Sequence, residues 1–221
     1  MNSIIEPELR QIRDRVMLIG GEVERAIERA LQALSTHNLE LAQQVVNDDD
    51  RIDALELELD QLGIRVLALK APEARDLRFV VSASKIVTLL ERLGDHASSI
   101  ARAAIDLGSQ PPSFKVHPDL MYMAKAAREM LHDALDAFAD QDAVAARTII
   151  DRDDEIDLLY DRLFQEMLDQ VAEHPSSAGQ VTRLVLVAKH LEQIGDRAKD
   201  VCDEIVYMKE ALVIKHRRLV R

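Results

Sequence analysis

Apolar residues recur along this chain at alternating steps of three and four positions, the spacing of residues on one face of an α-helix. One series in the first half contains Ile52, Leu55, Leu59, Leu62, Val66 and Leu69. Another near the end contains Leu184, Val187, Leu191, Ile194, Ala198, Val201, Ile205, Met208 and Leu212. Sustained spacing of this kind produces a narrow buried stripe. The pattern therefore predicts long helices that pack against one another.

Prolines and turn-forming residues divide each half into three predicted helices. Pro7 suits the first turn of a helix, and Pro72 disfavours helix at the residue before it. In the first half the predicted helices cover residues 7–35, 38–70 and 73–107. The second half repeats the scheme, with breaks near Asp140 and at residues 174–177. A fibrous coiled coil is the alternative, but such regular breaks argue against it.

The two halves share a sequence repeat. When Ile52 is aligned with Ile156, the surrounding acids and leucines coincide. The Glu-x-x-Gly-Asp segments that begin at Glu91 and Glu192 coincide as well. We therefore predict an all-α fold of two tandem, repeat-related three-helix bundles with six long helices. The predicted bundles cover residues 1–107 and 119–221, joined by a linker at 108–118.

Composition and charge narrow the classes of protein. Hydrophobic residues make up 48% of the 221 residues and aromatic residues only 3%, so few residues suit a sheet. The net charge of −12 argues against nucleic-acid binding, because phosphate contacts need a basic surface. The basic residues at 215–221 suit a solvated helix end.

Neither an export signal nor a membrane span is predicted. The first residues have no basic segment followed by an apolar one. No stretch reaches the roughly 20 apolar residues that cross a bilayer. The single cysteine, Cys202, lies among apolar helix positions and is predicted to be a buried, inert thiol. We expect a cytoplasmic protein without direct membrane insertion.

Acidic residues recur in pairs four positions apart, at equivalent places in the two halves. The pairs are Asp49 with Asp53, Glu91 with Asp95, Asp153 with Asp157, and Glu192 with Asp196. Like charges at this spacing cost a helix about 0.2–0.5 kcal/mol, and a bound cation would reverse that cost. Oxygen ligands suit Mg, Mn, Ca or iron. The alternatives are a solvated acidic face, or ion pairs with Arg92, Arg197 or Lys199.

The acids flank the predicted buried stripes, so two neighbouring helices could present two pairs to one site. Gly94 and Gly195 lie between the members of the later pairs. A glycine inside a helix costs about 1 kcal/mol relative to alanine, so its double occurrence indicates a close approach by a neighbouring backbone or a ligand. His96 could add a nitrogen ligand. No catalytic triad, P-loop or Glu-x-x-His motif is present, so no catalytic residue is predicted.

Residues 91–96 and 192–197, together with residues 49–53 and 153–157, resemble the duplicated motifs of the PhoU family. The resemblance extends from about Leu9 to Tyr207. It implies that the acid pairs hold divalent or trivalent metal ions, such as iron, manganese, zinc or magnesium, as multinuclear clusters. One implied site contains Asp49, Asp53, Glu91 and Asp95, and the other contains Asp153, Asp157, Glu192 and Asp196.

The resemblance also implies a non-enzymatic regulator of phosphate transport and of phosphate-starvation signalling. Its implied partners are the phosphate ABC transporter ATPase, a membrane sensor histidine kinase and a second copy of the chain. Two alternatives stay open: a carboxylate-bridged metal enzyme acting on phosphoesters, and a structural helical scaffold.

Two features depart from the family pattern or differ between the repeats. The second motif has Gln193 and Arg197 in place of Arg and His, which predicts weaker metal binding there. Tyr160 and Phe164 stand where the first half has acids, and they could be extra core or an exposed contact.

Overall fold

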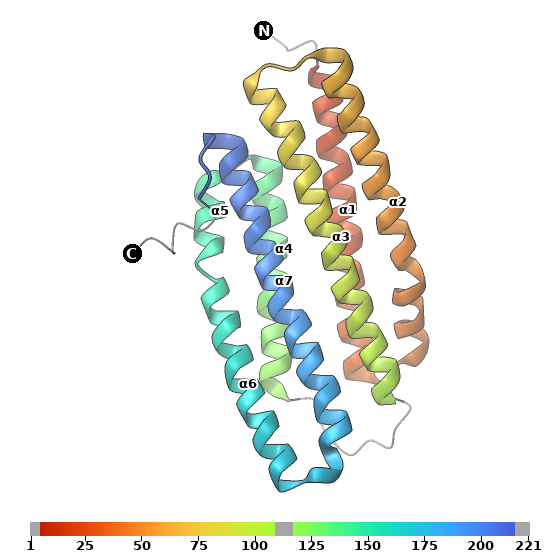
Figure 1. The fold of residues 1–221 in the computed structure, drawn as a ribbon. Coiled ribbons are helices and arrows are strands. Elements are labelled where there is room, and N and C mark those ends of the chain that lie inside the picture. Colours follow the sequence, from red (N-terminus) through yellow and green to blue (C-terminus); the bar gives the residue numbers. More distant parts are fainter. Residues whose placement is uncertain (1–4, 109–116, 215–221) are drawn as a thin grey trace.

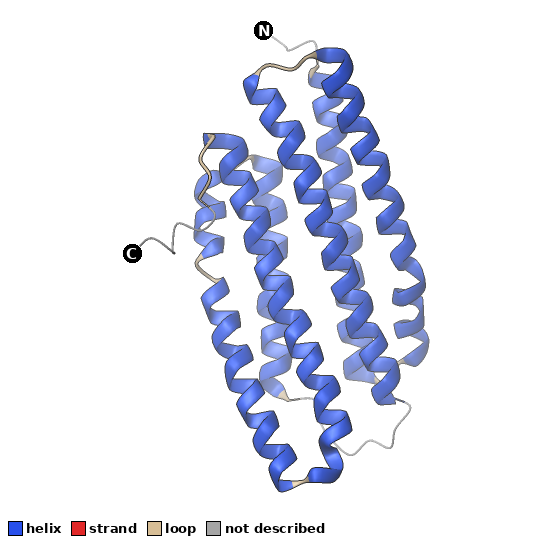
Figure 2. Ribbon diagram, viewed as in Figure 1, coloured by secondary structure: helices blue, strands red, loops and turns tan. Residues whose placement is uncertain are grey.

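The computed structural model describes residues 5–108 and 117–214, and all regular structure in these residues is helical (Figures 1 and 2). The predicted all-α fold of two three-helix bundles is confirmed, with one departure in the second bundle. The predicted linker falls mostly on residues outside the described ranges, as does the basic segment 215–221. The domain boundaries drawn from the sequence therefore stay a prediction.

The first bundle consists of three long helices that all pack against one another. These are α1 (Glu6–Thr36), α2 (Leu39–Lys70) and α3 (Ala74–Gly108). His37 ends α1 in a left-handed conformation, and the Asn38 side chain then caps α2 by accepting a hydrogen bond from the Leu41 amide at 3.0 Å. Ala71 ends α2 in the same left-handed way, directly before Pro72. The turns lie where the sequence predicts them.

The second bundle repeats this arrangement, except that its second helix is divided. Its elements are α4 (Pro118–Asp140), α5 (Ala143–Ile150), α6 (Asp153–Glu173), a short 3₁₀ turn (Pro175–Ser177) and α7 (Ala178–Glu210). The prediction of one continuous helix here was wrong.

Local hydrogen bonding and a contact with another helix both accompany the break between α5 and α6. The Arg152 amide donates to the Ile149 carbonyl at 3.0 Å, which tightens the last turn of α5. The Arg152 guanidinium forms an ion pair with Asp133 of α4, and three acids then occupy the first turn of α6. Acids are favourable at a helix N-terminus, so the chain restarts a helix there.

The two bundles lie side by side and share one continuous apolar core (Figure 1). Helix α3 packs on α7, and α1 packs on α4. Phe79 of α3 stacks on Phe138 of α4 with ring centroids 6.2 Å apart. Gly20 allows α1 to approach α4, because a Cβ there would lie 2.5 Å from Leu135 Cδ2. The halves therefore form one packed body.

The predicted apolar stripes are buried except at their ends. Leu69 is 77% exposed and Leu212 is 42% exposed, so including these two residues in the stripes was wrong. Both lie at or beyond the end of a helix, where no neighbouring helix covers them. Cys202 is buried as predicted, and burial raises the pKa of its thiol to about 12. None of the described helices has both the length and the apolar character of a membrane span.

Candidate metal centre

The eight predicted acids form two sets, each contributed by two packed helices. The first set contains Asp49 and Asp53 of α2 with Glu91 and Asp95 of α3. The second set contains Asp153 and Asp157 of α6 with Glu192 and Asp196 of α7. Burial, followed by repulsion from other members of the same set, raises the pKa values of Asp49, Glu91 and Asp157, so the members of each set lie near one another.

A glycine and an isoleucine position the first carboxylate of each set. A Cβ on Gly94 would lie 2.9 Å from Ile52 Cδ1 and 3.6 Å from Asp49 Oδ1. In the second half, a Cβ on Gly195 would lie 2.9 Å from Ile156 Cδ1 and 3.4 Å from an oxygen of the first acid, Oδ1 of Asp153. A close approach occurs at both glycines, but the approaching groups are isoleucine and aspartate side chains of the neighbouring helix and not the predicted backbone or ligand.

The first set carries negative charge that the more distant Arg92 and Arg102 offset only in part. Burial, together with repulsion from Asp95 and Asp53, raises the pKa of Asp49, although the nearby Ser98 hydroxyl opposes this. The hydroxyl lies beside the carboxylate without reaching good hydrogen-bond geometry. Burial and the neighbouring acids raise the pKa of Glu91 to about 7. Within residues 5–108 and 117–214, no Lys or Arg forms an ion pair with any of these four acids.

Three arginines that line a cavity beside Asp49 are paired with other acids. A cavity of about 140 Å³ between α1 and α2 reaches Asp49 and Gly94, and three arginines line it. Arg25 and Arg51 both bind Glu22, at 2.9 and 2.7 Å. The third, Arg29, binds Asp48 at 2.8 Å. These guanidinium groups neutralise their own partners, so the first set stays open to an external cation.

The acidic surface of the first half extends beyond the four predicted residues. The Thr88 hydroxyl donates to Glu56 at 2.9 Å, and the Ser84 hydroxyl donates to Asp60 at 3.0 Å. These two α2 acids continue the row of Asp49 and Asp53 along the α3 boundary. Glu56 and Asp60 are the first-half acids at the positions that Tyr160 and Phe164 occupy in the second half.

The second set carries its own positive charges. The Lys199 ammonium binds Asp153, a residue with 1% exposure, and lies 3.5 Å from Asp196. Lys189 binds Glu192 at 2.7 Å. Burial raises the pKa of Asp153 despite its pairing with Lys199.

The remaining acid of the second set is without such a lysine partner. Burial and repulsion from Asp153 and Asp196 raise the pKa of Asp157 to about 6. Arg197 binds Asp200 at 2.9 Å. The positive charge that the altered motif introduces, on Arg197, is therefore paired with Asp200 outside the set. The cation within the set is Lys199.

Aromatic residues replace the extended acidic row in the second half. Tyr160 and Phe164 are half-buried and stacked, with ring centroids 6.2 Å apart. The Lys189 ammonium lies 5.2 Å from the Tyr160 ring centroid. Tyr160 packs partly on the core, which agrees with the first of the two roles that the sequence left open, and its role as a partner contact stays a prediction.

The two sets differ in how well they fit a metal ion. The first set offers four carboxylates from two helices, and within residues 5–108 and 117–214 none of them forms an ion pair with a lysine or arginine. Burial, followed by repulsion between the acids, raises the pKa of Asp49 and of Glu91. Such a set suits a hard cation with oxygen ligands. The second set already pairs acids with two lysines, which leaves less negative charge for an added cation. His96 contacts His190 of α7, with Nδ1 atoms 3.3 Å apart, which turns this ring nitrogen toward the other half.

The comparisons with known proteins identify the repeat. The family model described as "PhoU domain" matches residues 16–104 and again residues 120–205. This chain belongs to the PhoU family.

PhoU relatives match over nearly the whole chain. The phosphate-specific transport system accessory protein PhoU homologue of Aquifex aeolicus is 37% identical to this chain, and the match covers 96% of each. The accessory protein PhoU of Escherichia coli is 32% identical over 95% of this chain and 86% of its own. The crystal structure of PhoU from Pseudomonas aeruginosa has a TM-score of 0.91 and 33% identity, covering 94% of this chain and 100% of that one.

One tight group of potential ligands was missed by sequence reasoning. His117, Asp119 and Glu166 offer atoms within 4.8 Å of one another, the one such group of three found among the described residues. The His117 ring binds Glu166 at 3.0 Å and accepts from the Asp119 amide at 3.2 Å. The group is partly exposed and lies outside both PhoU carboxylate sets. No sequence motif joins these residues, because α4 and α6 bring them together only in the folded bundle.

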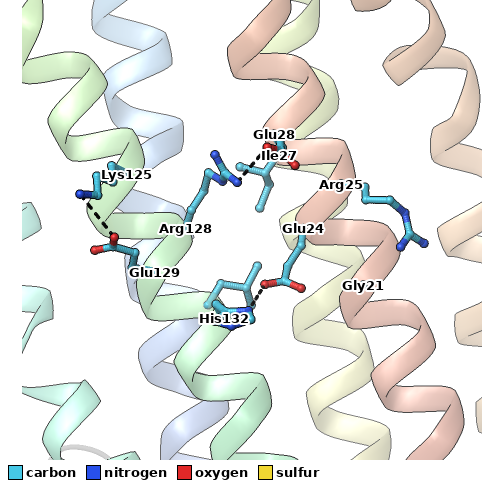
Figure 3. A pocket seen from close by; sticks show the side chains of 10 residues that line it. Gly21, Glu24, Arg25, Ile27, Glu28, Lys125, Arg128, Glu129 and His132 are labelled. Carbon is cyan, nitrogen blue, oxygen red and sulfur yellow. Dashed lines mark hydrogen bonds and ion pairs between the residues drawn. The ribbon is translucent and has the colours of Figure 1, made fainter.

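A groove of about 590 Å³ lies between the two PhoU repeats, where α1 faces α4 (Figure 3). Two ion pairs cross it: His132 binds Glu24 at 2.8 Å and Arg128 binds Glu28 at 3.3 Å (Figure 3). The pairing with Glu24 raises the pKa of His132. The groove contains none of the eight predicted acids.

Proposed function

We propose that this chain is an accessory regulator of phosphate uptake that restrains the phosphate-starvation response from the cytoplasm. In this proposal it acts as a homodimeric adaptor between the phosphate ABC transporter ATPase and a membrane sensor histidine kinase. Family membership supports the link to phosphate transport, because the relatives from Aquifex aeolicus and Escherichia coli are named accessory proteins of that system.

The observation that carries the proposal furthest is the first carboxylate set, whose four acids form no ion pair with Lys or Arg within the described residues. Asp49, Asp53, Glu91 and Asp95 would hold iron, manganese, zinc or magnesium, as single ions or as a cluster. A bound cation would stabilise the charged carboxylates, which burial and repulsion from neighbouring acids disfavour, as the raised pKa of Glu91, about 7, reflects. The four side chains come from α2 and α3, so a cation held by all four would link these two helices.

Two chemically different surfaces on one rigid body support an adaptor role. The first repeat presents an acidic face that includes Glu56 and Asp60. The second repeat presents the stacked Tyr160 and Phe164 beside Lys189. Acidic faces orient and accelerate encounters with basic partners, whereas aromatic residues tend to dominate the affinity of contacts. We propose the aromatic pair as a contact with a partner or a second protomer.

Metal binding is tested on gently purified protein by elemental analysis. We expect iron, manganese, zinc or magnesium, and we expect Asp53→Asn with Asp95→Asn to remove most of it. The matched control is Asp50→Asn with Asp106→Asn, which changes the same charge on α2 and α3 outside the set. Equal metal content in both double variants would refute the first-set assignment.

Regulation is tested in cells. Deleting the gene should raise phosphatase expression and phosphate uptake when phosphate is plentiful, and the wild-type gene should restore repression. Unchanged phosphate-dependent expression after deletion would contradict the regulatory role. The rival role in phosphoester hydrolysis is tested on the same metal-loaded protein with p-nitrophenyl phosphate. Turnover that disappears with Asp53→Asn and Asp95→Asn would establish an enzyme instead.

A further inference from the structure

The two carboxylate sets have the same backbone frame but different charges beside it. In the alignment of the repeats, Ser98 of α3 corresponds to Lys199 of α7, and Thr88 corresponds to Lys189. Two neutral hydroxyl residues in the first half are therefore two cations in the second. Both of these cations bind members of the second set.

We propose that the Lys199 ammonium is the built-in cation of the second carboxylate set and excludes a metal ion from it. This inference deepens the proposed function, on which its metal component rests. The carboxylate that Lys199 binds belongs to Asp153, whose 1% exposure leaves little access to water. A charge so deeply buried needs a partner, because desolvation of an unpaired carboxylate is costly.

The position of Lys199 places its ammonium between the two helices of the set. It binds Asp153 of α6 and lies 3.5 Å from Asp196 on its own helix, α7. It thus contacts the counterparts of Asp49 and Asp95, two of the acids that would hold a metal ion in the first set. The other oxygen of the buried acid, Asp153 Oδ1, lies beside Gly195 and has no hydrogen-bond partner among the described residues.

Further charges around the set reinforce this arrangement. Lys189 of α7 neutralises Glu192. Arg197, the residue that departs from the family motif, is held by Asp200. Three of the four acids of the second set thus contact a lysine, and in this proposal the first set is the metal site.

The ion pair is tested by thermal unfolding in a chelator, which reads the protein without metal. Lys199→Ser copies the first half and should lower the unfolding midpoint. In an Asp153→Asn background the same substitution should cost much less, because the buried negative charge is gone. Lys209→Ser, an exposed residue of the same helix, is the control and should have little effect in either background. An equal loss from Lys199→Ser in both backgrounds would overturn the pairing.

Metal exclusion is tested in protein whose first set is disabled by Asp53→Asn and Asp95→Asn, with Mn²⁺ as the probe. We expect Lys199→Ser to raise the Mn²⁺ affinity of the remaining set at least about tenfold, because a nearby like charge is removed. Lys209→Ser should leave it unchanged. Equal Mn²⁺ binding with and without Lys199, including equal absence of binding, would overturn the exclusion.

Metal binding by the protein and the ion pair of Lys199 with Asp153 can be tested independently. If the unaltered protein binds no metal at all, the metal component of the proposed function fails, while the unfolding comparison still decides the ion pair. If the unaltered protein binds metal and Asp153→Asn with Asp196→Asn removes as much of it as Asp53→Asn with Asp95→Asn, the further inference fails and the proposed function stands.

Discussion

The two halves of this chain hold carboxylates in the same way but treat their charge differently. In each half a glycine on the third helix admits an isoleucine and an aspartate from the second. In the first half the Ser98 hydroxyl lies beside Asp49. In the second half Lys199 binds Asp153 and Lys189 binds Glu192. A duplicated frame therefore persists while a few neighbouring residues change the charge beside it.

We expect substitutions in this glycine–isoleucine frame to lower stability more than substitutions on the surface, because the packed interior has no room for movement. The frame is also the same in both halves despite the α5–α6 break. The second helix of the second bundle is interrupted at Asp151 and Arg152, yet Ile156 still meets Gly195 as Ile52 meets Gly94. We expect the loss in free energy of unfolding to decrease from substitutions in the interior to substitutions on the surface.

The largest effect is expected where the two halves share their core. Phe138 is fully buried and stacks on Phe79 of the other half. Phe138→Ala should lower the free energy of unfolding by about 3–5 kcal/mol, measured by urea denaturation. Leu158→Ala, at a 67% exposed position, is the control and should change it little. An unfolding curve in which the first half keeps its original midpoint would show that the halves are energetically separate.

The shared glycine frame should respond equally in both halves. Gly94→Leu and Gly195→Leu each place side-chain atoms where an isoleucine already lies within 2.9 Å of a Cβ. Each should lower the free energy of unfolding by about 1–3 kcal/mol, through overpacking. Gly179→Leu is the control, because open space surrounds its Cβ position. A clear loss in one half alone would mean that the frames are not equivalent.

Exchanging surface residues between the halves should have a smaller effect on stability. Tyr160→Glu with Phe164→Asp copies the first half and removes the aromatic stack and the contact with Lys189. We expect a loss of about 1–2 kcal/mol in the free energy of unfolding. Circular dichroism should show an unchanged helical fold, whereas dimerisation or pull-down of a transporter or kinase partner should weaken. Unchanged association in every assay would rule out the aromatic pair as a contact.

The smallest effect is expected from pH, measured in a chelator. Because the pKa of Glu91 is raised from 4.5 to about 7, the folded protein holds a proton there that the unfolded chain has released. Stability should therefore fall as pH rises from 4.5 to 7. After solvent screening we expect Glu91 to contribute about 1 kcal/mol to this fall.

Glu91→Gln should make the decline with pH shallower, as urea denaturation at a series of pH values would show. In the second half, Asp157→Asn should act in the same direction over a narrower range, because the pKa of Asp157 is raised from 3.8 to about 6. A decline of the same steepness in the Glu91→Gln variant would show that other groups cause it.

The repeat, the residues of both carboxylate sets and the helices other than the divided α5–α6 could be predicted from the sequence. Apolar spacing reports helices directly, since residues three and four apart share a face. Proline and asparagine marked the turns near Asn38 and Pro72, because their backbone and side-chain preferences act locally. The glycines between the later acid pairs indicated a close approach, which Ile52 and Ile156 provide.

Only the tertiary structure decided which charges meet. Lys199 was one of several cations that the sequence placed near acids, and its partner Asp153 lies on another helix. The α5–α6 break also depends on an ion pair between Arg152 and Asp133 of α4. Periodicity assigns a residue to a face of its own helix, but the rotation and spacing of neighbouring helices depend on the packing of the whole core. The charge of each carboxylate set is therefore a property of the packed bundle.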